Sequence, residues 1–160
     1  MARIKSFLWF ADKAEEAARF YAGVIPGSSV GAKMVLATDT PSGPAGSVYV
    51  IDFTLAGQAF SAMNAGRADP FNHSYSIMVE CEDQAEIDRI WDALLDGGSP
   101  VQCGWLKDRY GLSWQIVPKG FEEMMNHPDK AKAKRAADAM LGMVKFDLAK
   151  LRAAFEGTDA

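Results

Sequence analysis

The stretch Asp12-Lys13-Ala14-Glu15 returns as Asp83-Gln84-Ala85-Glu86, 71 residues further along the chain. The same offset relates three further pairs, Phe20 and Trp91, Ala22 and Ala93, and Gly27 and Gly98. Each copy follows an apolar run, at residues 4–10 and 75–81, so each begins as a strand that leads into a helix. A period this long indicates a duplicated half-domain rather than a solenoid repeat. We expect the two halves to share a core and to bind a ligand where they meet.

The first copy predicts the order β-α-β-β-β. Asp12 is expected to cap the helix while Glu15 reaches back, and Pro26-Gly27 ends it. Residues 34–36 suggest a strand, and residues 48–55 give the strongest strand of this half. Ala56-Gly57 is short enough for a hairpin turn that leads into a strand over residues 58–64.

The second copy follows the same plan in a shorter form. A strand over residues 74–80 precedes a helix from Asp83, and strands over 101–107 and 112–117 flank a turn at 108–111. The remaining chain predicts helices over 121–126, 129–143 and 147–155. The middle helix carries an apolar stripe of Ala133, Ala136, Ala137, Met140, Leu141 and Val144. This tail should therefore dock on the sheet or on a second subunit.

Composition limits the classes of protein. The chain has 160 residues, 49% of them hydrophobic, which suits one globular domain with a substantial core. A net charge of −4 argues against nucleic acid as a partner. There is no apolar stretch of roughly 20 residues and no signal-peptide pattern, so we expect a cytoplasmic protein with no membrane partner. Cys81 and Cys103 lack the spacing of zinc or redox motifs and are expected as reduced thiols, with a disulfide between them as the alternative.

Two motifs resemble a known family. Residues 4–21, with IKSFLWF and AEEA, and residues 102–118, QCGWLKDRYGLSWQIVP, are similar to PhnB-like proteins. These form a branch of the vicinal oxygen chelate, or glyoxalase/bleomycin-resistance/dioxygenase, superfamily and are often labelled 3-demethylubiquinone-9 3-methyltransferase. The resemblance implies one α+β domain over 1–160. It would consist of two βαβββ modules, 1–66 and 72–118, forming a glyoxalase-like half-open barrel, and a C-terminal helical extension, 119–160.

The resemblance also implies where a metal ion would bind. Metal-dependent members of the superfamily use His or similar ligands on the first strand of each module and Glu on the last strands. The first-strand positions fall on or next to Ser6 and Ile77, and the last-strand positions fall on Gln115 and within residues 59–64, which contain no acid and no His. These residues supply no strong donor, so we predict no metal and no cofactor. The methyltransferase label also finds no support, because no glycine-rich loop follows the first strand.

Candidate ligand-binding residues follow from the alternation of side chains along the strands. It turns Ser6 and Gln115 toward the cavity face of the resembled fold, with Leu8 on the side of Ser6, and turns Trp9 and Trp114 into the core between sheet and helix. A hydroxyl and an amide can orient a ligand by hydrogen bonds, although neither is an effective base. An apolar cavity wall is predicted from Tyr49, Phe53, Met63 and Trp105, for which core packing is the alternative.

Three further residues are candidates with plainer alternatives. Asp52 is the one acid within the long strand and is a candidate base. His73 lies between the modules, either as a hydrogen-bonding loop residue or at the cavity mouth. Cys103 is either a cavity thiol or a small buried apolar residue.

These expectations lead to one functional hypothesis with two rivals. We predict a homodimeric protein that binds a small organic molecule without a catalytic metal. The first rival is a metal-dependent lyase, isomerase or dioxygenase of the glyoxalase type. The second is a resistance protein that sequesters a drug and turns nothing over.

Overall fold

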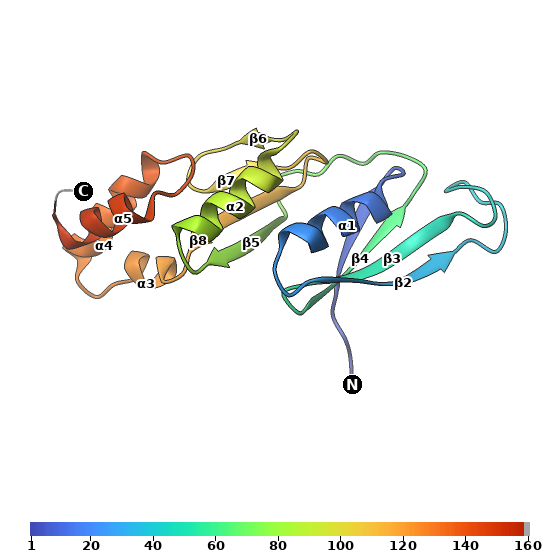
Figure 1. The fold of residues 1–160 in the computed structure, drawn as a ribbon, viewed down its shortest axis with the longest axis horizontal. Helices are drawn as coiled ribbons and strands as arrows, with labels where there is room; N and C mark the ends of the chain where they lie inside the picture. Colours follow the sequence, from blue (N-terminus) through green and yellow to red (C-terminus); the bar gives the residue numbers. More distant parts are fainter. Residues whose placement is uncertain (159–160) are drawn as a thin grey trace. The chain divides into compact units, whose positions relative to one another are not determined.

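The computed structural model describes residues 1–158 (Figure 1). The elements follow the order β1-α1-β2-β3-β4, then β5-α2-β6-β7-β8, then α3-α4-α5. The chain divides into two structural units, one covering Met1–Pro70 and the other beginning at Phe71. Because the division falls between the two copies of the repeat, each unit contains one βαβββ module, and the second unit also carries the helical tail. The fold is α+β and contains the two predicted βαβββ modules.

The first unit contains a four-stranded mixed sheet with the strand order β1-β4-β3-β2. Its strands are β1 (Ser6–Phe10), β2 (Ser29–Val35), β3 (Val48–Leu55) and β4 (Gln58–Asn64). β1 pairs with β4 in parallel, and the other pairs are antiparallel. β3 and β4 are joined by Ala56 and Gly57, whose φ angles of 47° and 85° belong to the predicted two-residue hairpin turn.

The second unit repeats this sheet with the strand order β5-β8-β7-β6. Its strands are β5 (Ser76–Cys81), β6 (Ser99–Pro100), β7 (Trp105–Lys107) and β8 (Ser113–Pro118). The turn between β7 and β8 is held by the buried carboxylate of Asp108. It accepts hydrogen bonds from the backbone N–H groups of Tyr110 and Leu112, at 2.8 and 3.1 Å, and from the Trp114 indole, at 2.9 Å.

One helix covers one face of each sheet. α1 (Ala14–Val24) buries Ala17, Ala18 and Tyr21 in the first unit, and α2 (Gln84–Leu95) buries Ile87, Ile90 and Trp91 in the second. We call the opposite face of each sheet its open face. Along each strand, alternate side chains point to opposite faces of the sheet. One set packs under the helix and completes the core, and the other set lies on the open face.

The two helices begin differently although their sequences match. Asp83 caps α2 as its repeat position predicts, accepting a hydrogen bond from the backbone N–H of Glu86 at 2.9 Å, while Glu86 accepts from the N–H of Glu82. The same prediction for Asp12 was wrong. The first residue of α1, Ala14, donates its N–H instead to Asn64 at the end of β4, at 2.8 Å. A tertiary contact therefore replaces the local cap in the first copy.

β2 and β7 depart furthest from their predicted extents, and β6 was not among the predicted strands. β2 begins at Ser29 rather than Met34, because this mostly exposed strand pairs with β3 through an irregular register and lacks an apolar pattern. β7 begins at Trp105 rather than residue 101, because Cys103 and Gly104 have φ angles of 59° and 78° that interrupt an extended strand. Cys81 and Cys103 are free thiols, as expected.

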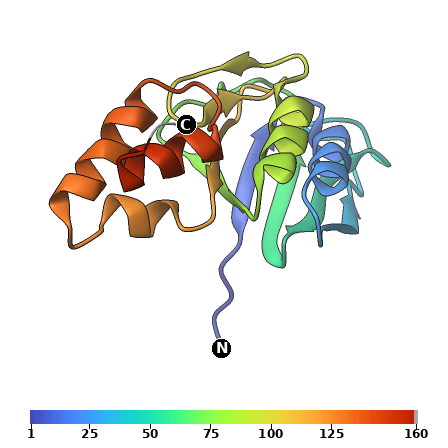
Figure 2. The ribbon, with the colours of Figure 1, turned by 60° about the vertical axis from the view of Figure 1, so that its left-hand side comes forward.

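The tail consists of α3 (Phe121–Met125), α4 (Lys130–Leu141) and α5 (Leu148–Glu156) (Figure 2). α4 packs against α3 and α5 and buries Ala133 and Ala136, whereas Leu141 and Val144 of the predicted stripe stay exposed. The segment between α4 and α5 contacts the βαβββ module of the second unit.

Hydrogen bonds hold this segment against the rest of the second unit. The N–H groups of Cys103 and Gly104 donate to the carbonyl oxygens of Met143 and Val144, both at 2.8 Å. The Gln84 side chain bonds to the backbone of residues 146 and 148 at 3.0 and 2.8 Å. The tail therefore docks on its own chain. In residues 1–158 there is no helix with the length and apolar character needed to span a membrane.

Candidate functional site

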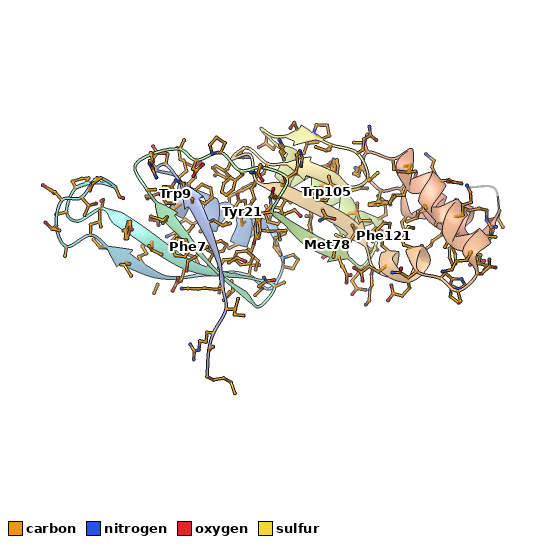
Figure 3. The ribbon with its side chains drawn as sticks, turned by 180° about the vertical axis from the view of Figure 1, so that it is seen from behind. Phe7, Trp9, Tyr21, Met78, Trp105 and Phe121 are labelled. Atoms are coloured by element: carbon orange, nitrogen blue, oxygen red, sulfur yellow. The ribbon has the colours of Figure 1, made fainter. Side chains whose placement is uncertain are left out.

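The open face of the first sheet shows that the register predicted for β1 was wrong by one residue. Leu8 and Phe10 are 3% and 5% exposed, and Ser6 shares their side, toward α1. Phe7 and Trp9 lie on the open face instead (Figure 3). The Trp9 indole donates to the carbonyl oxygen of Arg67 at 3.0 Å and is only half-buried. Ser6 thus lies beneath the helix layer, and Lys5 and Phe7 take the places expected for it.

A polar cluster occupies the centre of this open face. The Lys5 ammonium lies 2.8 Å from Oδ1 of Asp52 on β3. The same carboxylate oxygen accepts a short hydrogen bond from the hydroxyl of Ser61, the residue paired with Asp52 on β4. Ser61 is fully buried, whereas the side chains of Lys5 and Asp52 are 46% and 48% exposed. One buried hydroxyl therefore orients a carboxylate that remains accessible.

The charge state of Asp52 follows from these two donors. The hydrogen bond from Lys5, and then that from Ser61, lowers the pKa of Asp52 below its ordinary value of 3.8. Asp52 is therefore an anion at neutral pH. A lowered pKa also makes it a weaker proton acceptor, which disfavours the predicted role as a base.

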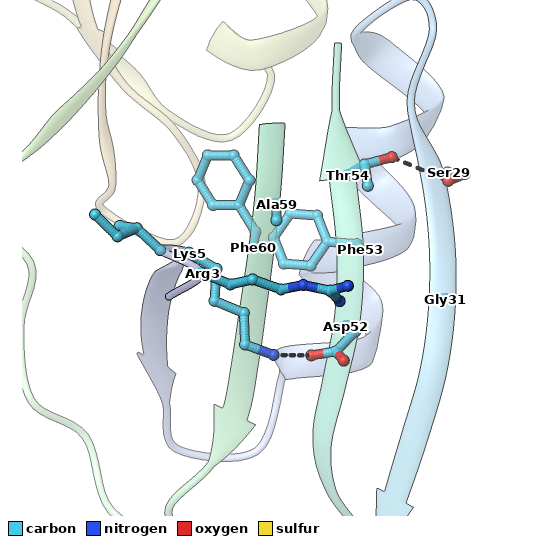
Figure 4. Close-up of a pocket in the computed structure, with 10 residues that line it drawn as sticks. Arg3, Lys5, Ser29, Gly31, Asp52, Phe53, Thr54, Ala59 and Phe60 are labelled. Carbon is cyan, nitrogen blue, oxygen red and sulfur yellow. Dashed lines mark hydrogen bonds and ion pairs between the residues drawn. The ribbon is translucent and has the colours of Figure 1, made fainter. Parts of the chain in front are cut away.

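Two hollows flank this cluster on the first unit. The first has a volume of about 320 Å³, and the second about 450 Å³. Lys5 and Asp52 line both of them, so the ion pair stands where the hollows adjoin. Figure 4 shows the first, which is lined by Arg3, Ile4, Lys5, Ser29, Gly31, Asp52, Phe53, Thr54, Ala59 and Phe60. Phe7 and Met34 provide apolar surface in the second and are 54% and 59% exposed.

The three apolar residues predicted in this unit have different environments. Phe53 is 2% exposed, stacks on Phe60 with 5.2 Å between ring centroids, and contacts Tyr21 of α1, so it belongs mainly to the core although it borders the first hollow. Tyr49 is half-buried, and alternation along β3 places it on the side of α1. Alternation along β4 places Met63 on the open face, but Met63 is only 9% exposed.

The open face of the second sheet brings together Gln115, Trp105 and Ser76. Gln115 and Trp105 are direct partners in the β7–β8 register, and the Gln115 amide donates to the Ser76 hydroxyl at 2.9 Å. Here the predicted parity was right, because Trp114 is fully buried on the side of α2. His73 makes an edge contact with Trp105, with 6.1 Å between ring centroids. Ile77 pairs with Trp114 on the helix side, so Ser76 and Met78 are the open-face residues of β5 next to Gln115.

Cys103 is separated from this group by its contacts with the tail. Its sulfur lies 3.7 Å from the Met140 carbonyl oxygen, and its N–H bonds to Met143. The buried-residue alternative therefore describes its surroundings better than a cavity thiol. The ligand-binding roles of Gln115, Trp105 and His73 stay predictions.

The residues present do not fit a divalent metal ion. The open-face positions at the first strand of each unit are occupied by Lys5 and Phe7 and by Ser76 and Met78. The corresponding positions on the last strands are occupied by Ser61 and Gln115. An ammonium group cannot ligate a cation, and hydroxyl and amide groups are weak ligands without a carboxylate, imidazole or thiolate. Within residues 1–158, no three His, Cys, Asp or Glu side chains are grouped so that they could hold an ion.

Sequence reasoning missed Lys5, Ser61 and Arg3. The offset of 71 residues relates Lys5 to Ser76, but only the structure shows that Ser76 contacts Gln115. Choosing Ser6 as the open-face residue removed Lys5 from consideration, and the offset does not relate Ser61 to Gln115. Arg3 precedes β1 and is brought to the hollow by the path of the chain, for which the sequence carries no signal.

Comparison with known proteins decides the family. The family model described as 3-demethylubiquinone-9 3-methyltransferase matches residues 2–117. The chain belongs to this PhnB-like family. A PhnB protein from Bacillus cereus, titled a putative 3-demethylubiquinone-9 3-methyltransferase, is 32% identical, with a TM-score of 0.65 over 73% of this chain and 99% of its own. The family match ends before α3, so the helical tail lies outside it.

More distant structures share the fold. A protein from Pseudomonas aeruginosa is 23% identical, with a TM-score of 0.59 over 74% of this chain and 98% of its own. A fosfomycin resistance protein from Listeria monocytogenes is 12% identical, with a TM-score of 0.53 over 77% and 97%. These likenesses place the family within the glyoxalase/bleomycin-resistance fold. No curated protein matches the chain.

Proposed function

We propose that this PhnB-like protein binds a small organic molecule on the open face of its first sheet, without a catalytic metal ion. The observation that carries the proposal is the Lys5–Asp52–Ser61 cluster between two hollows that each combine polar and apolar lining residues. A few fixed polar groups in an apolar hollow of a few hundred Å³ are typical of small-molecule sites.

The surroundings of the cluster favour binding over acid–base chemistry. Asp52 has a lowered pKa, and Ser61 is buried beneath it, so neither is suited to accept a proton from a ligand or to attack it. Asp52, held in position by Ser61, is instead suited to accept hydrogen bonds from a ligand. The hydroxyls of Ser29 and Thr54, 3.0 Å apart, add a second polar position in the first hollow.

The test fills the first hollow with a side chain. Ala59 is exposed on β4 and lines the hollow, so Ala59→Trp should occupy it with little effect on folding. Gln58→Trp is the matched control, because the neighbouring residue on the strand points to the other side. Fluorescence titration with Nile red, a neutral apolar dye, should show binding to the wild type and to Gln58→Trp and at least about tenfold weaker binding to Ala59→Trp. Equal affinity for all three proteins would refute the proposal.

A further inference from the structure

We infer that the ligand of this open face carries an anionic group, such as a carboxylate, sulfonate or phosphate, which Lys5 and Arg3 bind. The inference rests on the proposed function and specifies its ligand class. It starts from the charges around the first hollow, where the two cations Arg3 and Lys5 stand against the single carboxylate of Asp52. The hollow therefore has an excess of positive charge in a chain whose net charge is −4.

Lys5 keeps donors for a ligand. An ammonium group has three N–H donors, and Asp52 is one partner, at 2.8 Å. The Lys5 side chain is 46% exposed, so the rest of the ammonium faces solvent where the two hollows adjoin. Asp52 holds this ammonium in place and is itself held by Ser61. A ligand oxyanion would thus meet a cation that is already positioned.

Arg3 supplies a second cation at the same hollow. Its side chain runs alongside Lys5 toward Asp52 (Figure 4). Arg3 takes part in none of the ion pairs found among residues 1–158. A guanidinium offers parallel donors that match the oxygens of carboxylate, sulfonate and phosphate groups.

The rest of the surface defines the other half of the ligand. Ile4 and Ala59 line the first hollow and Phe7 and Met34 the second, and each of the four is exposed. An anionic head group at Lys5 and Arg3 would leave an apolar or aromatic body to cover these side chains. The ligand class is therefore an amphipathic organic anion rather than an inorganic one.

The experiment compares two dyes that differ in charge. 8-Anilinonaphthalene-1-sulfonate is an aromatic anion, and Nile red is neutral, and both are titrated by fluorescence against the folded full-length protein. Lys5→Met should weaken binding of the sulfonate by about fivefold or more relative to any change in the affinity for Nile red. Asp52→Asn should strengthen sulfonate binding, because it removes the competing negative charge while the amide oxygen can still accept the hydrogen bond that positions Lys5. Lys119→Met is the control, since Lys119 is also an exposed lysine paired with a carboxylate, that of Glu82, in the second unit.

The outcomes separate this inference from the proposed function. If Ala59→Trp blocks both dyes but Lys5→Met and Asp52→Asn leave sulfonate binding unchanged, the binding site stands and the anionic ligand class is wrong. Weaker sulfonate binding by Asp52→Asn, or equal losses for Lys5→Met and Lys119→Met, would also overturn the inference. If Ala59→Trp changes neither dye, the proposed function itself fails. Arg3→Gln, outside every strand, should repeat the loss if Lys5→Met does not fold.

Discussion

Trp9 and Trp114 have similar positions in apolar strand sequences but opposite environments. Trp114 is fully buried and donates its indole N–H to Asp108, whereas Trp9 lies half-buried on the open face. Trp114→Ala should lower the free energy of unfolding by about 3–5 kcal/mol, because it leaves a cavity. Trp9→Ala should cost about 1 kcal/mol, mainly the hydrogen bond to Arg67. Urea unfolding of both variants measures the difference, and equal losses would contradict the observed strand faces.

Asp108 stabilises the turn between β7 and β8. Asp108 is 3% exposed, and its carboxylate accepts hydrogen bonds from the N–H groups of Tyr110 and Leu112 and from the Trp114 indole, so Asp108→Ala should leave buried donors unpaired and cost about 3 kcal/mol or more. Asp96→Ala is the control, because Asp96 pairs with Arg109 but its side chain is 77% exposed, and its loss should cost under about 1 kcal/mol. Thermal and urea unfolding give both values. A cost for Asp108→Ala no larger than that of the control would show that the turn does not depend on this carboxylate.

The two thiols should differ in reactivity. Burial, and then the nearby Glu86, raises the pKa of Cys81 to about 12, and Cys81 has no exposed surface. We expect iodoacetamide at mildly alkaline pH to label the half-buried Cys103 first and Cys81 only after unfolding in urea, as peptide mass spectrometry would show. Because the folded-state pKa lies above the ordinary value of 9.0, the neutral thiol's contribution to stability is present below pH 9 and is lost as the pH rises toward 12. Equal labelling of both native thiols would contradict this environment.

At the scale of elements, the tail depends on a close approach between Gly104 and Phe146. A Cβ atom on Gly104 would lie 2.4 Å from the Phe146 ring and 2.7 Å from the Ile116 carbonyl oxygen. Gly104→Ala should therefore push the tail away, in addition to straining a φ of 78°. Gly111→Ala has a similar φ of 84° with nothing within 4 Å, so it measures the strain alone, about 1–2 kcal/mol.

Hydrogen exchange locates the effect of the two glycine substitutions. Gly104→Ala should speed exchange of the amides of α4 and α5, and Gly111→Ala should leave them as in the wild type. Equal exchange in the two variants would mean that the tail does not rely on this contact.

At the scale of the whole molecule, we propose a homodimer. One sequence-based reason, beside the family resemblance and the incomplete barrel of each module, was the stripe on α4, but Ala133 and Ala136 are already buried within the chain. The proposal now rests on the family resemblance and on exposed apolar side chains, among them Val35 at 50% and Leu141 at 65%. Sedimentation velocity at micromolar concentration should show a dimer, which would bury about 800 Å² per partner if the interface is of standard size.

Two substitutions distinguish the surfaces that a dimer could use. Leu141→Glu should give monomers if the tail forms the interface, and Val35→Glu should do so if β2 forms it. A monomeric wild type would refute the dimer outright.

The sequence by itself determined the duplicated βαβββ plan, the family and the parity of the second sheet. These follow from sequence patterns: the repeat offset, the alternation around Gln115, and the motif over residues 102–118. The β3–β4 hairpin was equally readable, because Ala56-Gly57 matches a two-residue turn.

Only the tertiary structure decided which face of β1 is open, what caps α1 and where the tail docks. Ser6 and Lys5 are neighbours in an apolar run, so either can begin the open face until pairing with β4 sets the register. The cap of α1 comes from Asn64, which is distant in sequence. The candidate site depends on the same long-range pairing, because Lys5 just before β1, Asp52 on β3 and Ser61 on β4 meet only when the sheet forms.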